Sequence, residues 1–475
     1  MKGNRFTVIL LSLFIPVLTY FSPSFANQQP TSQPLSEADA LNLGTQAYIY
    51  GYPLITMDMT RRVMTNVAKL EGSKAPMGQF VNMQNYPNAS FHDVTAPNAD
   101  TLYSIAWLDL AKEPYILHIP NTDGRYYLMP MLSAWTDVFA VPGKRTAGSD
   151  AQDFAIVGPN WHQKLPVKFP IFKSPTNLVW IIGRTYCTGT PEDYQKAHNI
   201  QDKYTLTPFS YFNKSYTPPT GSISAAIDMK TPVRDQVNTM NAATYFKNLA
   251  ILMKDNPPSK ADAPMVATLA KLGIVPGQEF DINKLDPAVA KGLNEAVAAG
   301  QKAIMMQGKN AAIMKNGWEI NTKTGLYGTD YLQRAFVAAI GLGANRPQDA
   351  IYPLTVVDAT NKKLNGANKY IIHFNKDQTP PVNGFWSLTM YNDQYFFIDN
   401  EINKYTVSPR DTLVKNQDGS IDIYIQHNSP GDNYASNWLP APTGNFILLF
   451  RFYWPKDAII NGAWVPPAVE INKHA

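Results

Sequence analysis

The chain has 475 residues, of which 41 are Lys or Arg and 37 are Asp or Glu. This near balance excludes the basic groove of a nucleic-acid-binding protein, so we expect no nucleic-acid partner. Cys187 is the only cysteine, which excludes an internal disulfide and leaves core burial to stabilise the fold.

The first 26 residues have the pattern of a secretory signal peptide. Lys2 and Arg5 precede an apolar run over residues 6–21, and Ser24-Phe25-Ala26 supplies the small residues that signal peptidase requires. We therefore expect cleavage after Ala26 and a periplasmic or secreted protein; the alternative is an uncleaved N-terminal anchor. Further apolar runs are too short to span a bilayer, so no integral membrane segment is expected after cleavage.

A helical pattern follows over residues 36–67. Ser36 is the expected N-cap, and Glu37 and Asp39 lie in the first turn. Pro53 is expected to end or kink this helix, with a second helical piece running to about residue 67.

Short apolar and aromatic runs separated by turn residues predict strands over residues 68–220 and again over 350–460. One predicted strand is "YFFIDN", residues 395–400. Between the two regions, residues 235–345 have helical spacing. The predicted fold is mainly β with a helical insert: an N-terminal helix, a β-sandwich-like domain, a helical segment and a C-terminal jelly-roll-like β-sandwich.

Several long strings resemble one family. They are "PNADTLYS" with "YIYGYPL" upstream of it, and then "NGANKYIIHF", "PPVNGFWSLTMY", "NKY" and "SNWLPAPTGNFILLFRFYWP". The chain resembles exported bacterial proteins that pair two domains of unknown function, numbered 1254 on the N-terminal side and 1214 on the C-terminal side. The resemblance implies a β domain, a helical segment and a jelly-roll-like domain. It implies no function.

The "PNADTLY" turn gathers hydrogen-bonding groups where a buried strand begins: Asn98, Asp100, Thr101 and Tyr103. One interpretation is structural, because Asn and Asp side chains commonly satisfy the backbone of a turn. In the other, the turn borders a cleft, where Asp100 acts as a base or metal ligand and Tyr103 as a hydrogen-bond donor.

Other candidate ligand-binding residues combine aromatic and charged side chains. Trp135 and Asp137 place a ring beside a carboxylate, a pairing suited to sugar-like ligands. Arg184 and Arg451 lie within apolar strands, where an arginine is costly unless it has a partner. Each arginine is therefore either a buried structural group or an anion-binding group. Three aromatic residues of the second β region complete the set: Trp386, Tyr391 and Trp438.

The chain has no metal-binding or nucleotide-binding signature. Spacings such as HxH, HExxH or Cys–His are absent, so no metal site is predicted, although distant strands could assemble one from His373 or His427. The P-loop, GxGxxG, GxSxG and SxxK motifs are also absent, which argues against common NTPases, dinucleotide enzymes and α/β-hydrolases. The sequence does not identify a cofactor.

Three functions remain open. The first is a ligand-binding protein that holds a small or carbohydrate-like molecule in a cleft near the "PNADTLY" turn. The second is a periplasmic hydrolase-type enzyme that uses Asp100 and Tyr103. The third is a structural or assembly protein, in which the helical segment could form the contact of a homo-oligomer.

Overall fold

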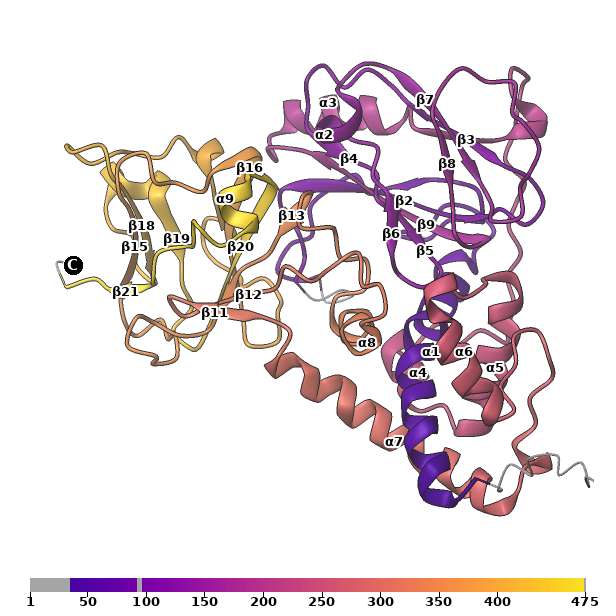
Figure 1. The fold of residues 1–475 in the computed structure, drawn as a ribbon. Helices are drawn as coiled ribbons and strands as arrows, with labels where there is room; N and C mark the ends of the chain where they lie inside the picture. The colour runs from indigo at the N-terminus through magenta and orange to yellow at the C-terminus, as the bar shows by residue number, and fades with distance from the viewer. Residues whose placement is uncertain (1–34, 92–95, 474–475) are drawn as a thin grey trace, which may run out of the picture. The chain divides into compact units, whose positions relative to one another are not determined.

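The computed structural model describes residues 35–91 and 96–473. The predicted signal peptide and its cleavage site after Ala26 lie outside the described residues. From Ser36 onward the described chain belongs to one folded unit. It contains four open sheets, with most of the helices in its middle portion, so the predicted fold class is confirmed (Figure 1).

Helix α1 (Glu37–Thr65) begins as the sequence predicts, since the Ser36 side chain accepts a hydrogen bond from the Asp39 backbone N–H at 3.1 Å. It does not end at Pro53 but runs on to Thr65. Residues 50–58 are almost entirely buried by neighbouring helices, and the Tyr245 hydroxyl donates to the Tyr48 carbonyl at 2.7 Å in the turn before the proline. Tertiary packing therefore keeps the helix continuous at Pro53, where the proline has no N–H to donate to the helical hydrogen bond.

Five helices from the middle of the chain contact α1 and, with it, form a helical group beside the sheets (Figure 1). They are α4 (Val233–Asn238), α5 (Ala242–Asp255), α6 (Ala263–Lys271), α7 (Pro287–Met306) and α8 (Tyr331–Ile340). None of the described helices is both long enough and apolar enough to cross a membrane.

Glycines allow α1 and α7 to approach each other closely. A Cβ atom placed on Gly292 of α7 would lie 2.5 Å from the Glu37 carbonyl oxygen and 2.7 Å from the Leu41 nitrogen of α1. A Cβ on Gly300 would lie 2.5 Å from the Tyr48 ring. Because backbone atoms cannot move aside as a flexible side chain can, Gly292 limits the helix separation most strictly.

The first β domain has two sheets. One has the order β1-β2-β9-β5-β6, with β4 paired to β9, and the other has the order β10-β3-β7-β8. Side chains from both sheets, including Leu108, Leu117, Ile156 and Ile181, form the core between them. Helices α2 (Lys144–Ala147) and α3 (Pro191–Gln201) interrupt the strands. The strands are β1 (Val81–Asn82), β2 (Thr101–Asp109), β3 (Tyr115–Ile119), β4 (Tyr127–Leu128), β5 (Met131–Ser133), β6 (Val138–Ala140), β7 (Gln152–Val157), β8 (Ile171–Lys173), β9 (Leu178–Tyr186) and β10 (Thr205–Pro208).

The second β domain also has two sheets. One has the order β11-β12-β14-β20-β16-β17, with β13 paired to β20, and the other has the order β19-β18-β15-β21. Helix α9 (Asp457–Ile460) follows β20. The strands are β11 (Ile313–Lys315), β12 (Trp318–Ile320), β13 (Ala350–Ile351), β14 (Leu354–Thr355), β15 (Tyr370–Phe374), β16 (Val382–Tyr391), β17 (Thr406–Val407), β18 (Ile421–Gln426), β19 (Trp438–Pro440), β20 (Ile447–Pro455) and β21 (Glu470–Ile471).

Two local features differ from the sequence prediction. Strands β11 and β12 lie inside the predicted helical segment 235–345 but belong to a sheet of the second β domain. Residues 395–400 do not form the predicted strand, because the Asn392 side chain accepts hydrogen bonds from the backbone N–H groups of Gln394 and Phe396, both at 2.9 Å, and closes a turn. Phe397 then stacks on Tyr405, with ring centroids 4.6 Å apart.

The close approach of α1 and α7 gives a stability prediction. We expect Gly292→Ala to lower the free energy of unfolding by about 1–3 kcal/mol, because the added methyl group meets α1 backbone. Guanidinium denaturation followed by circular dichroism measures this change. Gly444→Ala is the matched control, since a Cβ there has no heavy atom within 4 Å. Equal stability of the two variants would contradict the packing described.

Candidate functional site

The "PNADTLY" turn has the hydrogen bonds of an Asx-type turn, as one of the two interpretations expects. The Asn98 side-chain oxygen accepts from the backbone N–H groups of Asp100 at 2.7 Å and Thr101 at 3.2 Å. The Asn98 amide nitrogen donates to the Tyr453 hydroxyl on β20 at 2.8 Å. The same side chain thus shapes the turn and fixes it to the second β domain, while Thr101 begins β2.

Asp100 forms a buried ion pair between the two β domains. Its side chain is fully buried, and its oxygens accept from the Ser387 hydroxyl at 2.6 Å and from Arg410 Nη1 at 2.8 Å. Arg410 Nη2 also donates to the Ala99 carbonyl and to the Thr406 hydroxyl. Burial alone would lower the pKa of Arg410, but Asp100 and nearby tyrosines raise it above its usual value. Arg410 therefore stays charged, and both oxygens of Asp100 have partners.

Arg451 and Tyr391 hold the turn from its other side. Arg451 Nη2 donates to the Pro97 carbonyl at 3.1 Å and to the Tyr391 hydroxyl at 2.6 Å, and that hydroxyl donates to the Pro97 carbonyl at 2.6 Å. Arg451 Nη1 donates to the Thr389 hydroxyl. Burial raises the pKa of Tyr391 to about 12, so it remains a neutral donor. Carbonyl and hydroxyl oxygens thus provide the partners that a strand arginine requires.

Arg184 and Tyr103 also come together at this interface. The Arg184 guanidinium lies 5.1 Å from the centroid of the Tyr103 ring, and Nη1 donates to the Ile182 carbonyl and the Asn345 side chain, both at 3.1 Å. Six predicted residues therefore share one buried interface between the β domains: Asn98, Asp100, Tyr103, Arg184, Tyr391 and Arg451.

The remaining predicted aromatic and acidic residues lie elsewhere. Trp135 donates from Nε1 to the Asn256 carbonyl at 3.2 Å, and burial raises the pKa of Asp137, which lies 3.6 Å from Arg334 of α8. Both therefore lie against the helical group. Trp386 is in the core of the second β domain, and Trp438 donates to the Gln426 carbonyl at 2.8 Å.

A cleft of about 600 Å³ lies directly beside the turn, and we call it the interdomain cleft. Ala99 and Arg410 form part of its wall, so Asp100 is directly behind the wall and outside the cleft. Three tyrosines, two asparagines and a lysine supply most of the remaining polar lining: Tyr86, Tyr194, Tyr405, Asn88, Asn403 and Lys404. None of these residues is among the predicted site residues, although "NKY", one of the strings that carry the family resemblance, contains three of them.

Charges in the interdomain cleft are matched. Arg410 pairs with Asp100, and Lys404 Nζ lies 3.9 Å from Asp411 Oδ1 while donating to the Ser436 carbonyl at 2.9 Å. Burial lowers the pKa of Lys404, and Asp411 opposes that effect. Two cations and two carboxylates therefore balance, which favours a ligand without net charge.

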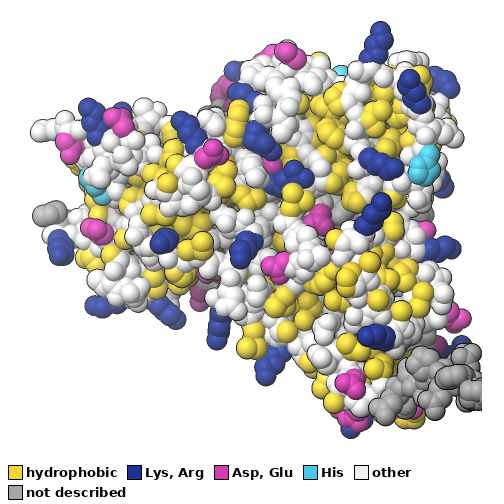
Figure 2. Space-filling model, in the orientation of Figure 1, with side chains coloured by type: hydrophobic (Ala, Val, Ile, Leu, Met, Phe, Trp, Pro, Cys, Tyr) yellow, Lys and Arg dark blue, Asp and Glu magenta, His cyan; other side chains and the backbone are white. Residues whose placement is uncertain are grey.

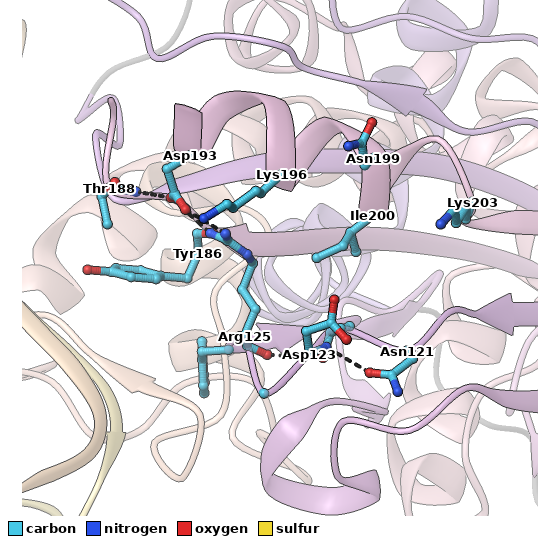
Figure 3. A pocket seen from close by; sticks show the side chains of 13 residues that line it. Asn121, Asp123, Arg125, Tyr186, Thr188, Asp193, Lys196, Asn199, Ile200 and Lys203 are labelled. Atoms are coloured by element: carbon cyan, nitrogen blue, oxygen red, sulfur yellow. Dashed lines mark hydrogen bonds and ion pairs between the residues drawn. The ribbon is translucent and has the colours of Figure 1, made fainter. Parts of the chain in front are cut away.

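A second cleft of about 750 Å³, the outer cleft, lies between α3 and the turn at residues 121–125 (Figure 3). On its wall Arg125 makes two hydrogen bonds to Asp193, at 2.9 and 2.5 Å, and one to the Tyr186 carbonyl at 2.8 Å. The Asp193 carboxylate also accepts from the Thr188 backbone N–H at 2.7 Å. This network fixes the loop after β9 to the N-terminal end of α3.

No metal centre is evident in the part of the chain that the structure describes. Within residues 35–91 and 96–473, no three His, Cys, Asp or Glu side chains gather in a way that could hold an ion. His373 Nδ1 contacts Asp422 at 2.6 Å, and His427 Nδ1 contacts the Ala441 carbonyl at 2.9 Å. Cys187 is buried, which raises the pKa of its thiol.

Two family models match the chain. One, described as "Protein of unknown function (DUF1254)", matches residues 77–208, and the other, described as "Protein of unknown function (DUF1214)", matches residues 349–457. The first range contains one wall of the interdomain cleft and the second range contains the other. No curated protein matches the chain.

Solved structures include a relative with the same fold. The crystal structure of the VPA0106 protein from Vibrio parahaemolyticus covers 91% of this chain and 100% of that chain, with a TM-score of 0.69 and 23% sequence identity. An uncharacterized protein from Burkholderia cenocepacia covers 92% of this chain and 94% of that chain, with a TM-score of 0.41 and 11% identity.

The buried ion pair gives a prediction about stability. Asp100→Asn leaves the buried Arg410 charge without its carboxylate, so we expect the free energy of unfolding to fall by about 3–5 kcal/mol. Ser387→Ala removes only a hydroxyl partner and is expected to cost about 1–3 kcal/mol. Guanidinium denaturation of the two variants compares these costs. A smaller loss for Asp100→Asn than for Ser387→Ala would contradict the assignment.

The Arg125–Asp193 pair gives a prediction about pH. The guanidinium hydrogen bonds hold the pKa of Asp193 well below its usual range. The pair therefore adds stability above the unfolded-state pKa of about 3.9, and that stability is lost as the pH falls further. We expect Asp193→Asn to lower the melting temperature at pH 7 and the difference to shrink at about pH 3. A difference that stays constant with pH would refute this role.

Proposed function

This chain belongs to the family of proteins that join a DUF1254 domain to a DUF1214 domain, and we propose that its interdomain cleft binds a small carbohydrate-like molecule. The observation that carries the proposal is the lining of the cleft. Three tyrosine side chains and the amides of Asn88 and Asn403 border one cavity of about 600 Å³. Ring faces that stack on the apolar side of a sugar, combined with amides that bond its hydroxyls, are suited to carbohydrate recognition.

The electrostatics of the cleft support a neutral ligand. Arg410 and Lys404 each have a carboxylate within 4 Å, so neither cation requires an anionic ligand to balance it. Both can still donate hydrogen bonds to hydroxyl oxygens, because an ion pair does not use every N–H group. A polyhydroxylated molecule therefore fits the cleft better than a phosphate or a nucleotide.

The rigidity of the cleft also supports binding. Arg410 is fixed by Asp100, the Ala99 carbonyl and the Thr406 hydroxyl, and Tyr405 stacks on Phe397. Wall residues that are already ordered lose little conformational entropy when a ligand binds.

Export to the periplasm remains a prediction from residues 1–26.

The hydrolase alternative has less support. Both oxygens of Asp100 are occupied by Ser387 and Arg410, and its side chain is closed to solvent. The Tyr103 ring is covered by the Arg184 guanidinium. A reaction at Asp100 would require the ion pair to break and the β domains to separate, at a cost of several kcal/mol.

Tyr405→Ala tests the proposal. Among neutral oligosaccharides screened by isothermal titration calorimetry, we expect one or more to bind. We expect Tyr405→Ala to weaken that binding about tenfold or more through loss of a stacking surface. Tyr405→Phe should retain most of the affinity, because it keeps the ring.

Tyr211→Ala is the matched control, since Tyr211 is exposed and does not line the cleft. Melting temperatures of all three variants separate loss of binding from loss of folding. If no neutral saccharide binds, or if Tyr405→Ala and Tyr211→Ala behave alike, the proposed function is wrong.

A further inference from the structure

The two clefts are adjacent and share structural elements. Thr188 lines both of them. Tyr186 lines the outer cleft, and the positive charge of Arg410, which lines the interdomain cleft, opposes the rise that burial causes in the pKa of Tyr186. In Figure 3 the outer cleft follows α3, and the Tyr186 ring extends toward the second β domain. A ligand longer than one cleft could therefore continue past Thr188 into the other.

The outer cleft differs from the interdomain cleft in its net charge. Arg125 and Asp193 neutralise each other. Lys196 and Lys203 also line the outer cleft, and among the described residues neither amine lies within 4.0 Å of a carboxylate oxygen. Asp123 is the second carboxylate on the lining, after Asp193. Three cations and two carboxylates therefore give the outer cleft a net charge of +1.

The chain positions these two lysines in the same cleft. Both lysines line the outer cleft, Lys196 from α3 and Lys203 from the turn that follows the helix. Ile200 lies between them in the sequence and also lines the outer cleft (Figure 3). The result is a largely polar cleft with two lysine amines on its lining, which suits a chain that carries carboxylate groups along a sugar backbone.

We propose that the two clefts form one groove for an oligosaccharide that carries carboxylate groups, with a neutral portion in the interdomain cleft and a carboxylate at Lys196 and Lys203. This inference rests on the proposed function and adds the class of ligand. Each cleft alone has the size of a typical small-molecule site. Together they hold several sugar units, and the unpaired amines select acidic ones.

A tetrasaccharide with two neutral units and two uronic acid units, and its methyl ester, form a suitable pair of probes, since they differ only in whether the carboxylates are free. By calorimetry at low salt, we expect the full-length protein to bind the acid about tenfold more tightly than the ester. The double variant Lys196→Gln/Lys203→Gln should remove that preference by lowering the affinity for the acid to about that for the ester. Lys164→Gln/Lys168→Gln changes the charge equally at exposed positions outside both clefts and should preserve the preference.

The outcomes separate the two proposals. Equal affinity of the wild-type protein for the acid and the ester overturns the proposed specificity for acidic oligosaccharides. It does not contradict the proposed function. A preference that survives Lys196→Gln/Lys203→Gln, or that disappears equally in the control variant, also overturns it. Binding of neither probe, together with failure of all neutral saccharides, overturns both. Binding of the acid that Tyr405→Ala does not weaken overturns the shared groove.

Discussion

The buried ion pair between Asp100 and Arg410 is the interaction on which the arrangement of the β domains depends. It joins residues that are 310 positions apart, from the turn that begins β2 and from the segment after β17. A fully buried carboxylate is tolerated only when it is paired and hydrogen-bonded, and Ser387 supplies the second partner. The two domains cannot slide past each other at this point without leaving an unpaired charge in a low-dielectric interior.

The same ion pair also organises the candidate site. Arg410 contacts Asp100 on its buried side and borders the interdomain cleft on its open side, and Thr188 of that cleft also lines the outer cleft. Arg451 and Tyr391 hold the Pro97 carbonyl of the same turn. The conformation of the turn, the interface between the domains and the shape of both clefts are therefore coupled through a few hydrogen bonds. A mutation at Asp100 is expected to affect binding without any contact between Asp100 and the ligand.

Local patterns in the sequence predicted local structure well. Ser36 caps α1, and Asn98 forms the hydrogen bonds of a turn, because both depend only on residues close in sequence. The strand arginines Arg184 and Arg451 could be recognised as groups that need partners, but the partners could not be identified. The helix does not end at Pro53, one of the two effects predicted for it, because packing on neighbouring helices outweighs the missing hydrogen bond. Strands β11 and β12 have three residues each, too few to show an alternation.

The cleft could not be predicted from local pattern, because its two walls come from residues 86–194 and 402–411. The sequence drew attention to the turn beside the cleft, but Asp100 lies behind the wall. The lining comes mainly from tyrosines, asparagines and Lys404, of which only the "NKY" residues belong to a family string. Hydrogen exchange of the unchanged protein and of Asp100→Asn tests the central claim most directly. If the ion pair joins the two domains, Asp100→Asn exchanges faster in residues 96–104 and 402–411 together, while exchange in β3, β7, β15 and β18 is unchanged. Faster exchange confined to one of the two segments, or spread equally over all strands, would contradict it.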